Sequence, residues 1–202
     1  AEIIGRWSQT PAFCLNLTVL DRPTVHPQLA QVLGDFTKLS LLAVDCRVGV
    51  SFAERARAIG EQMFEDMDHG SFSGVEMLRE IGRKRGRGSD LMPVVFTSGI
   101  GSVRRMLGES EGRLSAPQYM ISQTSQVWLD CQVTDQFGGL EIGWDIREHV
   151  FPPIQMQAMF DAFVSLLHVL AEDSTCWTEG HHGLGSPSLE VEPEALALAS
   201  HS

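Results

Sequence analysis

Apolar and polar residues alternate along three parts of the chain, and this alternation predicts strands. From Ala12 to Leu20 every second side chain is apolar, which places Asn16 on the opposite, polar face of a half-buried strand. The same period recurs over residues 127–133 and 140–144, on either side of Gly138-Gly139. We therefore expect these two stretches to pair as a hairpin.

Two further apolar stretches predict strands of a different kind. Residues 36–46 are apolar with little interruption, which predicts a central strand covered on both faces. Residues 94–97 predict a short strand. The glycine-rich, polar stretch 99–118 that follows predicts a connecting loop with at most a short helical turn.

Two capping boxes predict the starts of helices. Residues 51–54 and 73–76 each have a serine followed three positions later by a glutamate, and an apolar pattern of helical period comes after each. The first helix is expected to end near Asp68. The second is expected to end in the glycine-rich, basic segment 82–88, whose composition is that of a loop.

Residues 152–172 have the strongest helical pattern, with two prolines at the start and a broad apolar stripe. Beyond Trp177 the composition changes to Gly, Ser, Pro and Glu, so residues 178–202 are expected to be a linker or tail. The order β-β-α-α-β-β-β-α predicts an α/β fold over residues 1–177, with a mixed sheet and helices on one side.

Composition and charge restrict the class of partner. Of the 202 residues 43% are hydrophobic, which is enough for a globular core. The net charge of −11 argues against nucleic acid as the main partner, because phosphate binding needs an excess of Lys and Arg. Basic residues concentrate in 79–87; we favour the solvated end of a helix over an anion-binding patch.

The cysteines bear on the cellular compartment. They lack the spacing of a disulfide framework or a zinc site, which predicts reduced thiols and a cytoplasmic location. No run of eighteen apolar residues predicts a membrane span. No secretory leader is visible at Ala1, although an internal piece of a longer polypeptide would look the same.

Common catalytic and metal-binding motifs are absent from the sequence. The pair His181-His182 lies in the glycine-rich tail, without a carboxylate or a third ligand nearby. Because a metal site needs three or four converging groups, we favour a solvated pair and expect no metal.

Four short segments, taken in their order and spacing, are more specific. They are LNLT at 15–18, GDFT at 34–37, PVVFTS at 93–98 and SQTSQVWLD at 122–130. In this arrangement the sequence resembles the C-terminal half of a heterocyclization domain of nonribosomal peptide synthetases. That family is the thiazoline- and oxazoline-forming branch of the condensation-domain superfamily, and the resemblance covers most of residues 7–177.

The resemblance implies a chloramphenicol acetyltransferase-like fold, in which two lobes form a V around a tunnel. Upstream and downstream peptidyl carrier proteins deliver thioesters on phosphopantetheine arms, so no directly bound cofactor is expected. The other implied partners are an adenylation domain and the N-terminal lobe of the same domain, which is expected to lie outside this sequence. We therefore expect the isolated chain to be inactive. The complete enzyme is expected to belong to a pathway that makes a siderophore or another natural product.

The implied reaction comprises amide formation, attack of a Cys, Ser or Thr side chain on that amide, and loss of water. The family's cyclodehydration pair maps by motif onto Thr97 and Asp130. Asp130 lies on the polar face of its strand, as a tunnel residue would, and moves protons if partial burial raises its pKa. A threonine hydroxyl is too weak a base to take the proton itself. Thr97 is therefore expected to position the reacting groups or to relay a proton. The alternatives are an arginine-paired carboxylate for Asp130 and a structural hydroxyl for Thr97.

The resemblance also implies tunnel positions at Gln123, Thr124, Gln126, Ser98 and Asn16. The first three either line the tunnel or satisfy the backbone of a loop. Asp35 and Thr37 are expected to hold a turn between strands. Asn16 is expected either to line the tunnel or to have a structural role of this kind.

Two residues depart from the family's pattern. Ser125 stands where the family usually has Pro, and Cys131 follows the aspartate where His or Asn is usual. These departures leave a degenerate module as an alternative. Two other functions are also alternatives: a domain that only forms amides, and a non-catalytic platform that docks a carrier protein.

Overall fold

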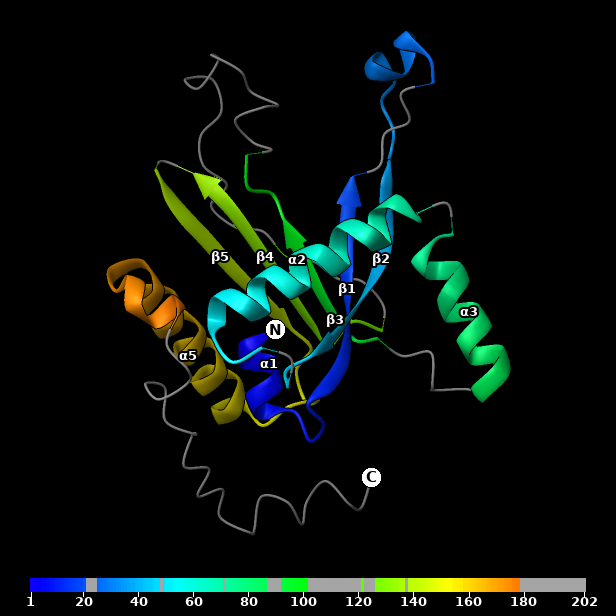
Figure 1. The fold of residues 1–202 in the computed structure, drawn as a ribbon. Coiled ribbons are helices and arrows are strands. Elements are labelled where there is room, and N and C mark those ends of the chain that lie inside the picture. Colours follow the sequence, from blue (N-terminus) through cyan, green and yellow to red (C-terminus); the bar gives the residue numbers. More distant parts are fainter. Residues whose placement is uncertain are drawn as a thin grey trace.

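A computed structural model of the chain describes residues 1–20, 25–47, 49–70, 72–86, 92–101, 121, 126–136 and 138–178. Its centre is a mixed five-stranded sheet with the order β2-β1-β3-β4-β5 (Figure 1). The strands are β1 (Ala12–Leu20), β2 (Thr37–Asp45), β3 (Val94–Ser98), β4 (Leu129–Gln136) and β5 (Gly139–Ile146). All five lie where the hydrophobic pattern predicts strands. Most of the predicted loop 99–118 and of the predicted tail 178–202 lies outside the described residues.

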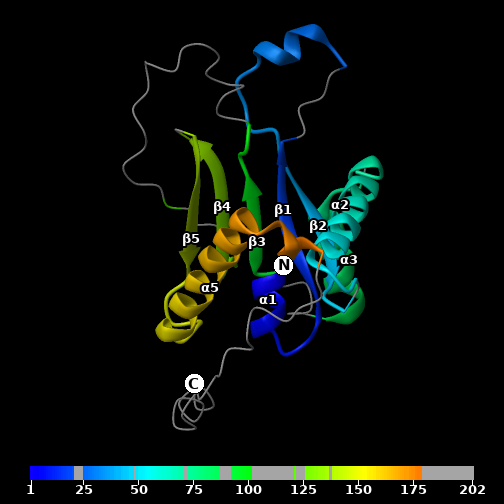
Figure 2. The same ribbon diagram turned by 60° about the vertical axis from the view of Figure 1, so that its left-hand side comes forward.

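Helices α1, α2 and α5 lie on one face of this sheet, whereas α3 stands beside the edge strand β2 (Figures 1 and 2). The helices are α1 (Glu2–Trp7), α2 (Phe52–Asp68), α3 (Gly74–Arg85) and α5 (Pro153–Glu172), with 3₁₀ turns at Pro27–Gln31 and Ser174–Trp177. The predicted α/β architecture is confirmed. The sequence pattern does not predict α1.

The strand pairing is antiparallel at both ends of the sheet and parallel in its middle. β1 pairs with β2, and β4 with β5, in antiparallel register, while β3 is parallel to both β1 and β4. The β4–β5 pair is the predicted hairpin. Its turn contains Gly138 at φ 79°, a backbone conformation that glycine adopts without a steric penalty.

The prediction that residues 36–46 form a central strand is wrong, because β2 lies at an edge of the sheet. Its apolar character has another cause. Leu42 and Val44 pack under α2, and Gly74 of α3 approaches the other side of the strand. Helices therefore accompany this edge strand, which is one way in which proteins protect sheet edges from pairing with other chains.

Two apolar clusters lie on the sheet face under α1, α2 and α5. The first cluster consists of Ile3, Leu129, Met156, Met159 and Leu166. The second consists of Leu15, Leu17, Leu42 and Val44, with Ile59 and Met63 of α2 packed against it. Burying a side chain of this size stabilises the fold by about 1.5–3 kcal/mol, so this face of the sheet is committed to the core.

The capping boxes predicted at the starts of α2 and α3 are both present. Ser51 Oγ accepts a hydrogen bond from the Glu54 backbone N–H at 3.2 Å, and Ser73 Oγ accepts one from Glu76 at the same distance. In each box the glutamate carboxylate accepts from the N-cap backbone N–H in return. Helix α2 ends at Asp68, as predicted.

Helix α3 ends at Arg85, within the predicted segment 82–88, but residues 82–85 are helical and not loop as their composition predicted. Glu80 forms ion pairs with Arg83 and Lys84 along this stretch. Such pairs support a helix, and cations in its last turn suit the helix dipole. The helix stops at Gly86, whose φ is 91°.

Helix α5 contains a stretch, Ile154–Glu172, that is long and apolar enough to cross a membrane, with a mean hydropathy of 1.4. Met156, Met159 and Leu166 on this helix are buried against the sheet. With 17% of the stretch buried, α5 packs on the sheet through one face of the helix.

Candidate active site

The sheet face turned away from α1, α2 and α5 carries a group of polar side chains from three adjacent strands. We call this group the polar strip; it consists of Asn16, Thr18, Thr97, Asp130 and Gln132. Successive side chains of a strand point to opposite faces, so each strip residue alternates with an apolar core residue. The face of the sheet under α1, α2 and α5 is buried in the core. The polar positions therefore lie on the opposite face.

Strand register brings the polar strip together in two rows. Asn16, Val95 and Asp130 are register partners across β1, β3 and β4, and the next row on this face holds Thr18, Thr97 and Gln132. Thr97 and Asp130 therefore lie on neighbouring strands and on one face, offset by one row.

Asp130 is buried, with 6% of its surface exposed. Its Oδ2 accepts a hydrogen bond from Gln132 Nε2 at 3.2 Å, whereas Oδ1 has no hydrogen-bond partner among the described residues. None of the ion pairs in the described part of the chain involves Asp130. Because buried polar atoms are nearly always hydrogen-bonded, an unpartnered carboxylate oxygen is a candidate for contact with a substrate.

The hydroxyl of Thr97 is held by a second hydroxyl. Thr97 Oγ1 donates a hydrogen bond to Thr18 Oγ1 at 3.0 Å, in a partly buried position. This bond uses the Thr97 proton and leaves a lone pair of its oxygen able to accept a hydrogen bond.

Asn16 is as buried as Asp130, with 6% of its surface exposed. Its Nδ2 donates to the Met92 backbone carbonyl at 2.5 Å, and its Oδ1 has no partner among the described residues. One end of this amide thus holds the segment before β3, and the other end presents an acceptor on the same row as Asp130.

Of the four other predicted tunnel residues, the two that the structure describes lie outside the polar strip. Ser98 is exposed at the end of β3, and its side chain belongs to the face opposite Thr97. Gln126 is exposed just before β4, with a φ of 70°. Gln123 and Thr124 lie outside the described residues.

Asp35 and Thr37 form a turn at the start of β2, where Thr37 is the register partner of Leu20, one row beyond Thr18. The Thr37 backbone N–H donates to Asp35 Oδ1 at 2.8 Å. Hydrogen bonds from the Thr37 side chain and then from its backbone hold the pKa of Asp35 below its ordinary value.

Sequence reasoning assigned no role to three residues beside the predicted pair. Thr18 and Gln132 hold Thr97 and Asp130, and Asp145 of β5 is the register partner of Asp130. The period-two pattern already placed Thr18 and Gln132 on polar faces. What it lacked was the identity of the neighbouring strands.

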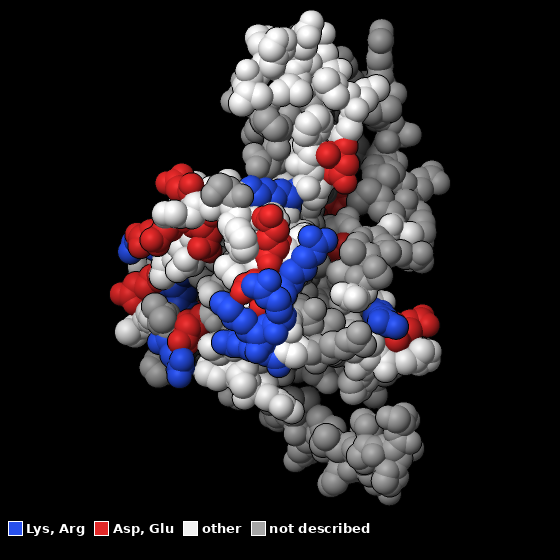
Figure 3. All heavy atoms as spheres, turned by 90° about the vertical axis from the view of Figure 1, so that its right-hand side faces the viewer, with Lys and Arg blue, Asp and Glu red and all other residues white. Residues whose placement is uncertain are grey.

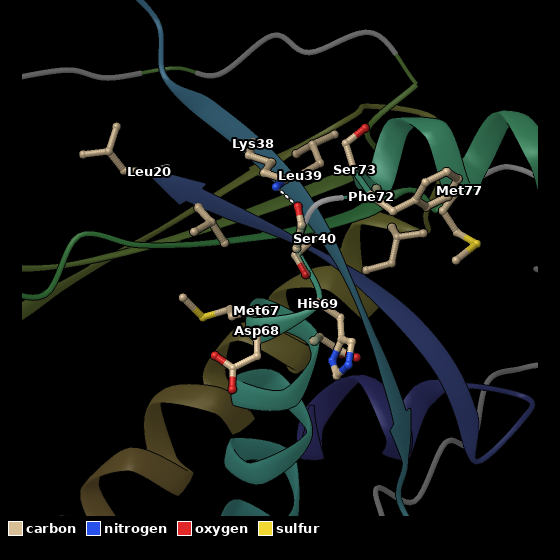
Figure 4. A pocket seen from close by; sticks show the side chains of 15 residues that line it. Leu20, Lys38, Leu39, Ser40, Met67, Asp68, His69, Phe72, Ser73 and Met77 are labelled. Carbon is tan, nitrogen blue, oxygen red and sulfur yellow. Dashed lines mark hydrogen bonds between the residues drawn. The ribbon is translucent and has the colours of Figure 1, made fainter. Parts of the chain in front are cut away.

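A groove of ≈ 570 Å³ lies between β2 and the turn that joins α2 to α3 (Figure 4). Met67, Phe72 and Met77 contribute apolar surface, and Lys38 Nζ donates a hydrogen bond to the Gly70 carbonyl oxygen. The lining includes no residue of the polar strip, so the groove is separate from the candidate active site.

Lys and Arg side chains gather on the side of the molecule where α3 lies (Figure 3). Arg83 and Lys84 are largely exposed and share Glu80 as their ion-pair partner. This is the arrangement of a solvated helix end, the favoured interpretation of the basic segment; Arg87 lies outside the described residues.

Comparisons with known proteins point to one family, although no protein-family model matches the chain. Pyochelin synthetase PchF of Pseudomonas aeruginosa is 67% identical over all 202 residues. Phenyloxazoline synthase MbtB of Mycolicibacterium paratuberculosis is 38% identical over 177 residues, or 88% of the chain. The chain spans only 11% and 15% of the lengths of these two relatives.

Solved structures agree with the sequence relatives. The EpoB cyclization-docking bidomain from Sorangium cellulosum matches with a TM-score of 0.69 and 40% identity, over 85% of this chain and 35% of that one. The first condensation domain of the calcium-dependent antibiotic synthetase matches with a TM-score of 0.56 over 85% of this chain and 36% of that one. At 16% identity the latter shows the fold alone.

The fold is therefore the chloramphenicol acetyltransferase-like fold of condensation domains. Within that superfamily, the chain belongs to the heterocyclization domains of nonribosomal peptide synthetases and forms part of such a domain. The resemblance based on the four sequence segments is confirmed.

Proposed function

We propose that this chain is the acceptor-side lobe of a heterocyclization domain that first condenses and then cyclises. The acyl donor is a carrier-bound thioester, and the acceptor is a carrier-bound Cys, Ser or Thr. The product is a thiazoline or oxazoline ring in a siderophore or a related natural product. The printed names of two relatives, a pyochelin synthetase and a phenyloxazoline synthase, support this class of product.

The reaction makes different demands at its successive stages. Amide formation requires the acceptor amine to be held against the thioester, which is mainly positioning. Attack of the side-chain thiol or hydroxyl on the amide carbon then gives a ring carbon that bears a hydroxyl. In the last stage the ring nitrogen loses its proton, a C=N bond forms, and the hydroxyl leaves with a proton as water. The attack transfers the proton of the thiol or hydroxyl to the amide oxygen, and the last stage transfers the proton of the ring nitrogen to the leaving hydroxyl. Both stages therefore use a group that moves protons.

Asp130 is the group that we assign to the proton transfer of the last stage. The observation that carries the assignment is its buried carboxylate, which has one oxygen held by Gln132 and the other without a partner. In this assignment Oδ1 takes the proton from the ring nitrogen and returns a proton to the departing hydroxyl.

Thr97 and Asn16 serve as neighbours of the reacting ring rather than as bases. The proton of the Thr97 hydroxyl is engaged with Thr18, so its oxygen accepts a hydrogen bond from the acceptor amide or the leaving water. Asn16 Oδ1 offers a second acceptor on the Asp130 row. Both residues orient the ring for the transfer.

The remaining parts of the machinery lie in other domains. We propose that an N-terminal lobe of the same domain closes the tunnel over the polar strip, that peptidyl carrier proteins supply both substrates on phosphopantetheine, and that an adenylation domain loads the acceptor. The four free cysteines suit the reducing cytoplasm, in which we place the enzyme.

The test is Asp130→Asn in the complete synthetase that carries this chain, with carrier-bound products measured by mass spectrometry. The linear amide should still form, while the cyclised product, which is lighter by one water, falls by about 10²–10⁴-fold. Thr97→Val should lower cyclisation less. Asp161→Asn is the control, because Asp161 is an exposed α5 carboxylate that also accepts from a glutamine.

Undiminished cyclisation by Asp130→Asn would remove the catalytic assignment and favour a domain that only forms amides. Binding of a carrier protein by the isolated chain, with normal chemistry in the variant, would favour the docking platform. The isolated chain is expected to form no heterocycle, because the first lobe contributes the rest of the tunnel wall.

A further inference from the structure

Gln132 is the side chain that contacts Asp130 in the polar strip. It lies two residues further along β4 and therefore on the same sheet face. Its Nε2 donates to Asp130 Oδ2 at 3.2 Å. Across the sheet its register partners are Thr97 on β3 and Gly143 on β5.

The surroundings of Gln132 leave it free to serve Asp130. Gly143 has no side chain, and a methyl group built there would meet no atom within 4 Å, so the position directly opposite Gln132 on β5 places no side chain against it. The amide makes no other side-chain hydrogen bond within the described residues. A structural glutamine would instead be expected to satisfy backbone groups, as Asn16 does with Met92.

We propose that Gln132 is a positioning residue for cyclodehydration, which holds Asp130 by Oδ2 so that the unpartnered Oδ1 faces the reacting ring. This inference rests on the proposed function, since it assumes that Asp130 moves the proton. With Oδ2 held in this way, Oδ1 is oriented to take the proton of the ring nitrogen.

The charges around Asp130 make this donor important. Asp145 on β5 is its register partner, and like charges directly opposite each other on a sheet repel. On β3 the neighbouring positions are Val95 and Thr97, which carry no charge. Among the residues of this row and the next, the Gln132 amide is the group seen donating to the carboxylate.

Two substitutions test this role in the complete synthetase. Gln132→Glu keeps the shape but replaces the donor by a second carboxylate, and Gln132→Met keeps the length without a donor. We expect cyclised product at neutral pH to fall about tenfold with Met and further with Glu, at an unchanged rate of amide formation. The pH profile for cyclisation should change in both variants, more for Glu than for Met, while the pH profile for amide formation stays that of the wild type.

The matched controls are Gln157→Glu and Gln157→Met on α5. Gln157 Nε2 donates to Asp161 at 2.8 Å, so these variants break the same kind of bond on an exposed helix surface. They should leave both the rate and the pH profile unchanged.

The outcomes separate this inference from the proposed function. If Asp130→Asn loses cyclisation while both Gln132 variants keep wild-type rates and pH profiles, the positioning role is wrong and the catalytic role of Asp130 stands. If Asp130→Asn cyclises normally, the proposed function fails instead. Equal loss of amide formation and cyclisation in both Gln132 variants, without a shift of the pH profile, would indicate a structural residue and overturn the inference.

Discussion

The hydrogen bond between Thr18 and Thr97 gives a prediction whose size follows from the structure. Thr18→Val removes one hydroxyl and keeps the β-branched shape that suits a strand. The bond spans 3.0 Å in a partly buried position, and such a bond contributes about 0.5–1.5 kcal/mol net. If it orients the Thr97 hydroxyl in the transition state, a loss of about 1 kcal/mol slows cyclodehydration about fivefold.

The assay is a single turnover of the complete synthetase from pre-loaded carriers, with the linear amide and the cyclised product followed separately. Thr18→Val should slow only the second product, and Thr18→Ser, which keeps the hydroxyl, should restore its rate. Thr134→Val is the matched control, because Thr134 lies two residues beyond Gln132 on β4.

Two results would refute the reasoning. A wild-type rate for Thr18→Val alongside a slow Thr97→Val would show that the bond does not orient Thr97. Equal slowing by Thr18→Val and Thr18→Ser would assign the effect to packing rather than to the hydroxyl.

Three further predictions concern stability and titration. Leu129→Ala removes a side chain that is 2% exposed and should lower the free energy of unfolding by about 2–5 kcal/mol, whereas a loss well under 1 kcal/mol in chemical denaturation would mean that the site collapses around the cavity. Gly74→Ala should lower the free energy of unfolding, because the new methyl would lie 2.7 Å from a backbone carbonyl oxygen of β2. Gly60→Ala within α2 meets nothing within 4 Å and should raise the free energy of unfolding by about 1 kcal/mol in the same measurement. Hydrogen bonds from Arg47 lower the pKa of Asp45 to about 2. The stabilisation from these bonds is present above the ordinary aspartate pKa and is lost as pH falls through about 2. An NMR titration of Asp45 should show this midpoint, and Arg47→Ala should return the midpoint toward the ordinary aspartate value.

Local sequence signals were sufficient for most elements of the fold. The capping boxes at Ser51 and Ser73 start helices because their hydrogen bonds form within one turn of chain. The alternation around Asn16 and Asp130 placed both on polar faces because the period of a strand is a property of its own backbone. Residues 82–85 are helical although their composition predicted a loop, because ion pairs and the helix dipole outweigh the glycine at position 82.

The partners of the candidate site could not be read in the same way. The bond from Thr97 to Thr18 joins residues 79 positions apart, and no local pattern specifies that β1 and β3 become neighbours. Gln132 shares a strand with Asp130, yet its significance depends on Gly143 and Thr97 lying on either side of it.

By itself, the sequence determined the α/β class, the faces of the strands, the helix starts and, through four motif segments, the heterocyclization family. Only the tertiary structure decided that β2 lies at an edge and that β3 lies between β1 and β4, which gathers the polar strip on one face. The physical reason is one of range. Side-chain periodicity and capping depend on residues within a few positions of each other, whereas strand order depends on which apolar faces of the whole chain can be buried together.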